Sequence, residues 1–76
     1  MVRLERALAA LSVADREALL LVGVEGFEQD AAAAIAGVSY AAFRQRLGRA
    51  RVRLSEKLAR LEANEANEPG RGEVSV

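Results

Sequence analysis

The spacing of apolar residues follows a helical period along most of the chain. Near the N-terminus, Leu4, Leu8 and Leu11 recur at i, i+4 and i+7, which places them on one face of a helix over residues 2–11. A nearly continuous apolar run then predicts a second helix over residues 13–24, which we expect to be the most buried element.

Capping residues and glycines mark where these helices begin and end. Ser12 is a favourable N-cap for the second helix, and Gly26 is suited to end it. A third helix, rich in alanine, is expected over residues 29–36, with Glu28 in the N-cap position. Ser39 is a good N-cap for a fourth helix, so the chain contains four predicted helices.

The junction of the third and fourth helices has the spacing of a helix-turn-helix. Gly37 can adopt the positive φ that the turn needs, and the small Ala33 lets the two helices cross closely. Val38 and Phe43 are expected to pack between them. Because a helix-turn-helix places its second helix in the major groove of DNA, the fourth helix is the candidate recognition helix.

The fourth helix, predicted to extend to about residue 63, has two distinct faces. At about 100° per residue, one face is a buried seam of Phe43, Leu47, Ala50, Leu54, Leu58 and Leu61. The opposite face carries Gln45, Gly48, Arg49, Val52 and Glu56. Tyr40, like Phe43, is interpreted as a core residue rather than a base-stacking group.

The composition supports a small all-α protein. Its 76 residues are enough for one domain, and an apolar content of 51% with a single proline favours a helical bundle. We assign residues 1–63 to a four-helix helix-turn-helix domain. Residues 64–76 are polar, contain the proline and two glycines, and are predicted to form a disordered acidic tail.

The residue types that are missing exclude several functions. The chain contains no Cys and no His, so it lacks a disulfide framework, the commonest zinc ligands and the usual acid–base side chain near neutral pH. No metal, no cofactor and no catalytic residue is therefore expected, and an enzyme is the weakest hypothesis. No apolar run is long enough to span a membrane, so a cytoplasmic protein is the default expectation.

A net charge of zero conceals a strongly basic helix. Seven basic residues and one acidic residue, Glu56, lie between Ser39 and Arg60, which gives this segment a net charge of +6. The remaining residues carry the compensating negative charge. Charge alone does not decide the function, because an arginine-rich helix face is often only a solvated surface.

The position of each polar residue on the fourth helix predicts whether it contacts bases or phosphates. Gln45, Gly48 and Arg49 point away from the seam in the N-terminal half, and they are the predicted base contacts. Gln can pair with adenine and Arg with guanine in the major groove. The predicted phosphate contacts flank this face: Ser39, Arg44, Arg46, Arg51 and Arg53.

The segment GFEQDAAAAIAGVSYAAFRQRLGRAR resembles a known family of DNA-binding domains. It is similar to region 4 of bacterial sigma factors, above all those of the extracytoplasmic-function group. The matching positions are Gly26, Phe27, Ala33, Gly37, Val38, Ser39, Arg44, Arg46, Leu47, Arg49, Ala50 and Arg51. The resemblance covers about residues 4–62, and its most specific part is the run from Arg46 to Arg51.

The resemblance implies a role in transcription initiation. Region 4 of these factors reads the −35 element of a promoter in double-stranded DNA while it is held on the flap of the RNA polymerase β subunit. It is also a common docking surface for anti-sigma factors. The resemblance places base contacts at Gln45, Gly48 and Arg49, and backbone contacts at Arg44 and Arg46.

The sequence departs from the family in ways that leave alternatives open. Ala41 and Ala42 replace a Gly-Thr pair, and the missing hydroxyl removes a phosphate contact that the family pattern would supply. The same fold could instead serve as a protein-interaction module for the β flap or an anti-sigma factor, or as a free-standing helix-turn-helix regulator. No polymerase-binding second domain is recognisable, so the chain is interpreted either as a piece of a longer factor or as a free-standing protein. The acidic tail could also fold back onto the basic face.

Overall fold

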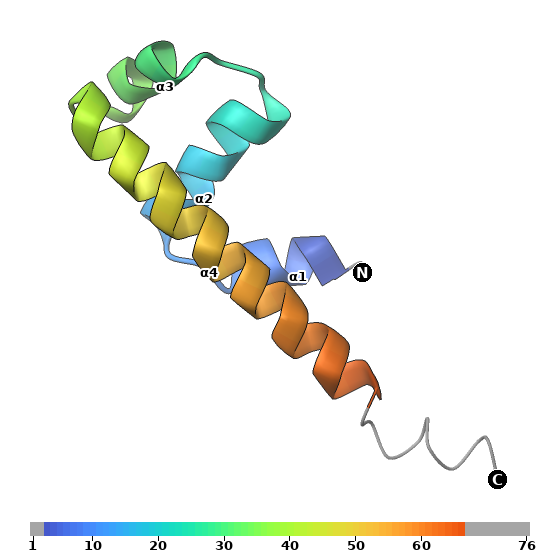
Figure 1. Ribbon diagram of the computed structural model, residues 1–76. Coiled ribbons are helices and arrows are strands. Elements are labelled where there is room, and N and C mark those ends of the chain that lie inside the picture. The colour runs from blue at the N-terminus through green and yellow to red at the C-terminus, as the bar shows by residue number, and fades with distance from the viewer. Residues whose placement is uncertain (1–2, 67–76) are drawn as a thin grey trace, which may run out of the picture.

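A computed structural model describes residues 3–66 of the chain, and the side chains of residues 3–64 (Figure 1). This part of the chain consists of helices without strands, so the predicted all-α class is confirmed. The elements are α1 (Arg3–Ala9), α2 (Val13–Leu19), the π-helical turn η1 (Leu20–Val24), α3 (Gln29–Ala36) and α4 (Tyr40–Ala66).

Helix α4 is the longest helix among the described residues, and the other α-helices pack along it. Its 27 residues give it a length of roughly 40 Å, at about 1.5 Å per residue. The three shorter α-helices all pack against it, with α3 at its N-terminal end and α1 beside its C-terminal half (Figure 1). The side chains of α4 therefore face either these helices or the opposite, uncovered side.

The core lies where α2, η1, α3 and the first half of α4 meet. Phe43 and Leu47 are its largest fully buried side chains, with exposed fractions of 0% and 2%. They pack with Ala18, Leu21, Ala32 and Ala33. The small alanines on α3 leave room for the larger ring of Phe43.

The helix-turn-helix is built as the sequence predicts. Gly37 has a φ of 76°, and its backbone N–H donates to the carbonyl of Ala34, while that of Val38 donates to the carbonyl of Ala33. These two bonds form a Schellman motif, which satisfies carbonyl groups at the end of α3. Val38 packs against the core, so the turn is fixed by both hydrogen bonds and apolar contact.

The predicted helix starts are also confirmed. The Ser12 hydroxyl accepts a hydrogen bond from the Asp15 N–H at 3.2 Å, and the Ser39 hydroxyl accepts one from the Ala42 N–H at 3.1 Å. Glu28 precedes α3 in extended conformation, but its side chain makes no capping bond. Serine hydroxyls therefore cap α2 and α4, which supply most of the helix–helix packing.

Three details differ from the predictions. The second helix is not α-helical throughout, because its last turn widens into η1, where the Glu25 N–H donates to the carbonyl of Leu20. It is also less buried than expected, since only Asp15, Ala18 and Leu21 are buried across α2 and η1. Tyr40 is 50% exposed and lies outside the core.

The boundary of the predicted tail is shifted by a short distance. Helix α4 extends to Ala66 instead of ending near residue 63, so residues 64–66 belong to the helix. The rest of the predicted tail, residues 67–76, lies outside the described residues.

Candidate nucleic-acid interface

The uncovered face of α4 carries all three predicted base contacts. Gln45, Gly48 and Arg49 are exposed. The opposite side of the same turns is buried through Phe43, Leu47 and Ala50. Because these buried residues fix the rotation of the helix about its axis, Gln45 and Arg49 point outward from a packed scaffold.

Gly48 leaves a gap in this outward face. A Cβ atom placed on it would meet no atom within 4 Å, so the surface beside the helix backbone is open. The gap continues into a shallow hollow of about 340 Å³ lined by Gly48, Arg49, Val52, Arg53 and Glu56. Val52 is 58% exposed there. The outward face can therefore approach another molecule closely at its middle.

Two predicted phosphate contacts lie at the N-terminal end of α4. Ser39 is exposed, and its hydroxyl caps the helix. Arg44 is also exposed, and its guanidinium carbon lies 5.7 Å from the centre of the Tyr40 ring. The helix N-terminus adds partial positive charge from its free N–H groups, so this end of α4 favours an anionic partner.

The other three predicted phosphate contacts lie in different surroundings. Arg51 is exposed, and Arg46 is half-buried. Arg53 donates from Nη1 to Oδ2 of Asp15 at 2.7 Å. Its positive charge is therefore already paired within the domain, whereas Arg51 has no ion pair among residues 3–64. The phosphate contact of Arg53 stays a prediction, which this pairing disfavours.

The Arg53–Asp15 pair is a structural link between two helices that sequence reasoning missed. Asp15 has an exposed fraction of 6%, and its carboxylate joins α2 to α4. A buried carboxylate needs a cationic or hydrogen-bonding partner, because leaving it unpaired is costly. The signal was present in the sequence: Asp15 precedes Ala18 by three residues, which places it on the buried face of α2.

Arg16 makes a second unforeseen contact. Its guanidinium lies 3.4 Å from the carbonyl oxygens of Leu8 and Ala9, at the end of α1. Carbonyl groups at a helix C-terminus have no partner within the helix, and an arginine can satisfy them. Arg16 therefore ties α1 to α2.

The described residues offer little for other chemistry. Across residues 3–66, no cluster of acidic side chains is placed to hold a metal ion. None of the helices in the same range combines the length and apolar character required to cross a membrane. The distinctive feature of the surface is the basic, uncovered face of α4.

Comparison with known protein families identifies this arrangement. The family described as sigma-70, region 4, matches residues 1–54, which is more than half of the chain. The chain belongs to the sigma-70 region 4 family. The match includes the helix-turn-helix and every predicted contact residue. Neither the curated proteins nor the solved structures gave a match.

Membership of this family gives the general role of the domain. Sigma-70 region 4 is a helix-turn-helix domain that binds DNA in transcription initiation and works with RNA polymerase. Region 4 domains are not enzymes. The uncovered basic face of α4 is the part of this structure that suits the DNA-binding role.

Proposed function

We propose that this region 4 domain reads the −35 element of a promoter through the uncovered face of α4. The observation that carries the proposal is the outward position of Gln45 and Arg49 on a helix whose opposite side is locked into the core. Both side chains lie within the first three turns of α4, the part of a recognition helix that meets base edges.

The side chains fit the chemistry of major-groove recognition. Arg49 can donate two hydrogen bonds to O6 and N7 of guanine, and Gln45 can pair with N6 and N7 of adenine. Gly48, which lies between them on the outward face, lets the backbone approach the base pairs. Arg44, Arg46, Arg51 and Ser39 surround this face and supply the contacts to phosphates, which fix position without reading sequence.

A sigma-type role also needs a surface for the polymerase that DNA leaves uncovered. A groove of about 200 Å³ lies between α1 and the C-terminal half of α4. Its lining residues are Arg6, Ala7, Ala10, Lys57, Arg60, Leu61 and Asn64. It is separated from Arg49 by at least two turns of α4, so DNA on the recognition residues would not cover it. We assign docking on the polymerase β flap to this groove.

Selection of bound duplexes from a random pool tests the proposal. The full chain should enrich one short motif, and binding should weaken as salt rises, by about 0.9 in log K per log unit of salt for each neutralised phosphate. Arg49→Ala should relax the preference at one base position, at a cost of about 1–3 kcal/mol. Arg46→Ala is the matched control, since loss of a phosphate contact should weaken all sequences alike. Enrichment of no motif would contradict promoter reading.

A second candidate is a protein-interaction module of the same fold. Val52, 58% exposed on the outward face, is the observation that favours it, because an exposed apolar side chain suits a protein partner. Such a module would bind a β-flap segment or an anti-sigma factor through α4 without binding duplex DNA at low salt. Duplex binding separates the two functions. In our primary proposal, charge reversal at Lys57 and Arg60 should abolish flap binding while duplex binding persists.

A further inference from the structure

The first turn of α4 holds an aromatic ring against an arginine. Tyr40 and Arg44 lie four residues apart, so their side chains meet on the same side of the helix. The guanidinium carbon is 5.7 Å from the centre of the Tyr40 ring, within the roughly 6 Å at which a cation is attracted to an aromatic face. Tyr40 is 50% exposed, so the ring serves as a surface platform rather than as part of the core.

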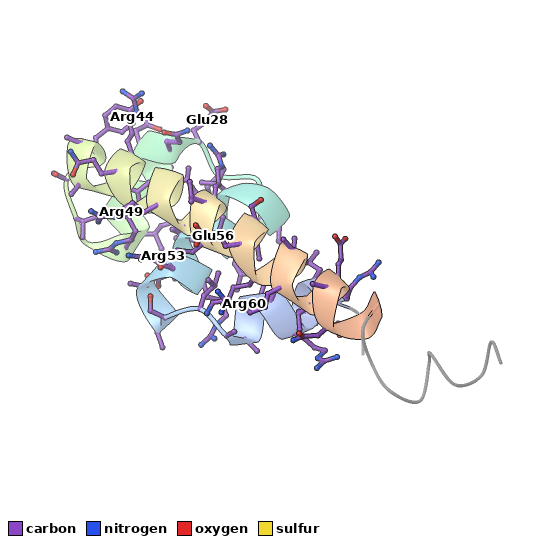
Figure 2. All side chains as sticks on the ribbon, turned by 60° about the horizontal axis from the view of Figure 1, so that its bottom comes forward. Glu28, Arg44, Arg49, Arg53, Glu56 and Arg60 are labelled. Atoms are coloured by element: carbon purple, nitrogen blue, oxygen red, sulfur yellow. The ribbon has the colours of Figure 1, made fainter. Side chains whose placement is uncertain are left out.

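The pair lies beside two carboxylates. A recess of about 650 Å³ is lined by Tyr40 and Arg44 on one side and by Glu28, Gln29 and Asp30 at the start of α3 on the other. Arg44 and Glu28 lie at the same end of the molecule (Figure 2). The Glu28 side chain makes no capping bond. Glu28 and Asp30 are the acidic residues that line this recess with Arg44.

We propose that Tyr40 is a positioning residue for DNA binding, which keeps Arg44 available to a phosphate instead of to Glu28 and Asp30. The inference rests on the proposed function of the α4 face. A guanidinium held over an aromatic ring by a cation–π contact keeps N–H groups free to donate to a phosphate. Stacking also removes rotamer freedom before the DNA arrives, which lowers the entropy cost of the contact.

Affinity measurements on a single duplex at several salt concentrations test this proposal with the full chain. Tyr40→Ala should weaken binding about 2- to 5-fold, the size expected for an exposed cation–π contact. Tyr40→Phe is the matched control and should bind as the unchanged chain does, because it keeps the ring. In an Arg44→Ala background, Tyr40→Ala should have no further effect, since the residue that it positions is gone.

The salt dependence separates positioning from a loss of stability. Arg44→Ala should lower the slope of log K against log salt by about 0.9, and Tyr40→Ala should lower it by part of that amount. A variant that is merely less stable would keep the slope. Glu28→Gln should improve the binding of Tyr40→Ala more than that of the unchanged chain. Equal gains in both backgrounds would contradict competition by the carboxylate.

Three further results would overturn the proposal, and one of them needs no DNA. If the Tyr40→Phe variant binds duplex DNA as weakly as the Tyr40→Ala variant, the hydroxyl group and not the ring is responsible for the effect. Additive effects of Tyr40→Ala and Arg44→Ala would show that the residues act separately. In NMR spectra of the free protein, the Arg44 Nε–H signal should shift when Tyr40 is changed to Leu, and an unchanged signal would rule out the stack. Failure of the unchanged chain to bind any duplex would instead defeat the proposed function, and this inference with it.

Discussion

The two halves of α4 are joined in one continuous helix but differ in how firmly they are held. In the N-terminal half, Phe43, Leu47 and Ala50 are all buried, at 2% exposure or less. In the C-terminal half, the corresponding seam residues Leu54, Leu58 and Leu61 are only half-buried. The half that carries Gln45 and Arg49 is therefore the half with the better packed underside.

The arginines along α4 also differ, in the kind of group that each one contacts. Arg44 contacts a neutral aromatic ring, so its full charge remains available to an external anion. Arg53 is paired with the buried carboxylate of Asp15, so its charge stabilises the contact between α2 and α4. Counting basic residues along the helix hides this difference. The partner of each arginine decides whether it supports the fold or the interface.

Truncation of the seam should show the largest contrast between the halves. Phe43→Ala should cost about 3–5 kcal/mol in the free energy of unfolding, because a fully buried ring is lost from a core that cannot collapse around the cavity. Leu58→Ala should cost about 1–2 kcal/mol, since this side chain is already partly in water. Chemical denaturation followed by circular dichroism measures both.

The Phe43→Ala loss is comparable with the whole stability of a small domain, about 5 kcal/mol at the low end. We therefore expect a weak unfolding transition or none for this variant. A loss near 1 kcal/mol would contradict the idea that Phe43 fills the space beside the alanines of α3.

The arginine comparison predicts the next largest effect. Arg53→Ala should cost about 1–2 kcal/mol of stability, because it leaves Asp15 buried without its partner, while partial exposure of the pair limits the loss. Arg51→Ala is the matched control and should change stability by about 0.5 kcal/mol or less. In DNA binding the order reverses: Arg51→Ala should lower the salt slope by about 0.9, and Arg53→Ala should leave it unchanged.

Equal stability losses for the two arginine variants would show that the Asp15 contact contributes nothing. Such a result would also return Arg53 to the set of free cations on the helix.

The helical period predicted the outward face of α4 but not the partners of its arginines. Periodicity fixes which side of a helix a residue occupies, and Gly37 fixes the turn, so both followed from the sequence. Asp15 and Arg53 are 38 residues apart in sequence, and their pairing depends on how two helices pack. Only the position of Asp15 on the buried face of α2 pointed to an unseen partner.

Tyr40 shows a second limit of prediction from helical periodicity. The sequence favours a core position for Tyr40 over a base-stacking role. In the structure, the first turn of α4 faces the start of α3 across the recess, so the ring remains half exposed. Periodicity gives the direction of a side chain but not how far the neighbouring helix extends to cover it.

The cap of α4 allows stability and DNA binding to be separated within the well-packed half. Ser39→Ala should cost about 1 kcal/mol, through loss of the bond to the Ala42 N–H. Ser39→Asp should keep the cap, because aspartate is also a favoured N-cap, but it adds a negative charge where a phosphate is expected. Binding of the Asp variant to all duplexes should therefore weaken at nearly unchanged melting temperature. Ser12→Ala, at the other serine cap, should lower stability alone, and a matching loss of DNA affinity in that variant would contradict the assignment.

Gly48 supplies the smallest and most selective test of the outward face. A Cβ at this position meets nothing within 4 Å, so Gly48→Ala should stabilise the domain by about 0.5–1 kcal/mol through higher helix propensity. Gly37→Ala should instead destabilise it by about 1–2 kcal/mol, because the turn requires a positive φ. If Gly48 lets α4 approach the base pairs, Gly48→Ala will bind duplex DNA more weakly although it melts at a higher temperature. Weaker binding by a more stable protein cannot arise from unfolding, so that result would locate the contact on the outward face itself. Tighter or unchanged binding would mean that the gap beside the helix is not where the DNA lies.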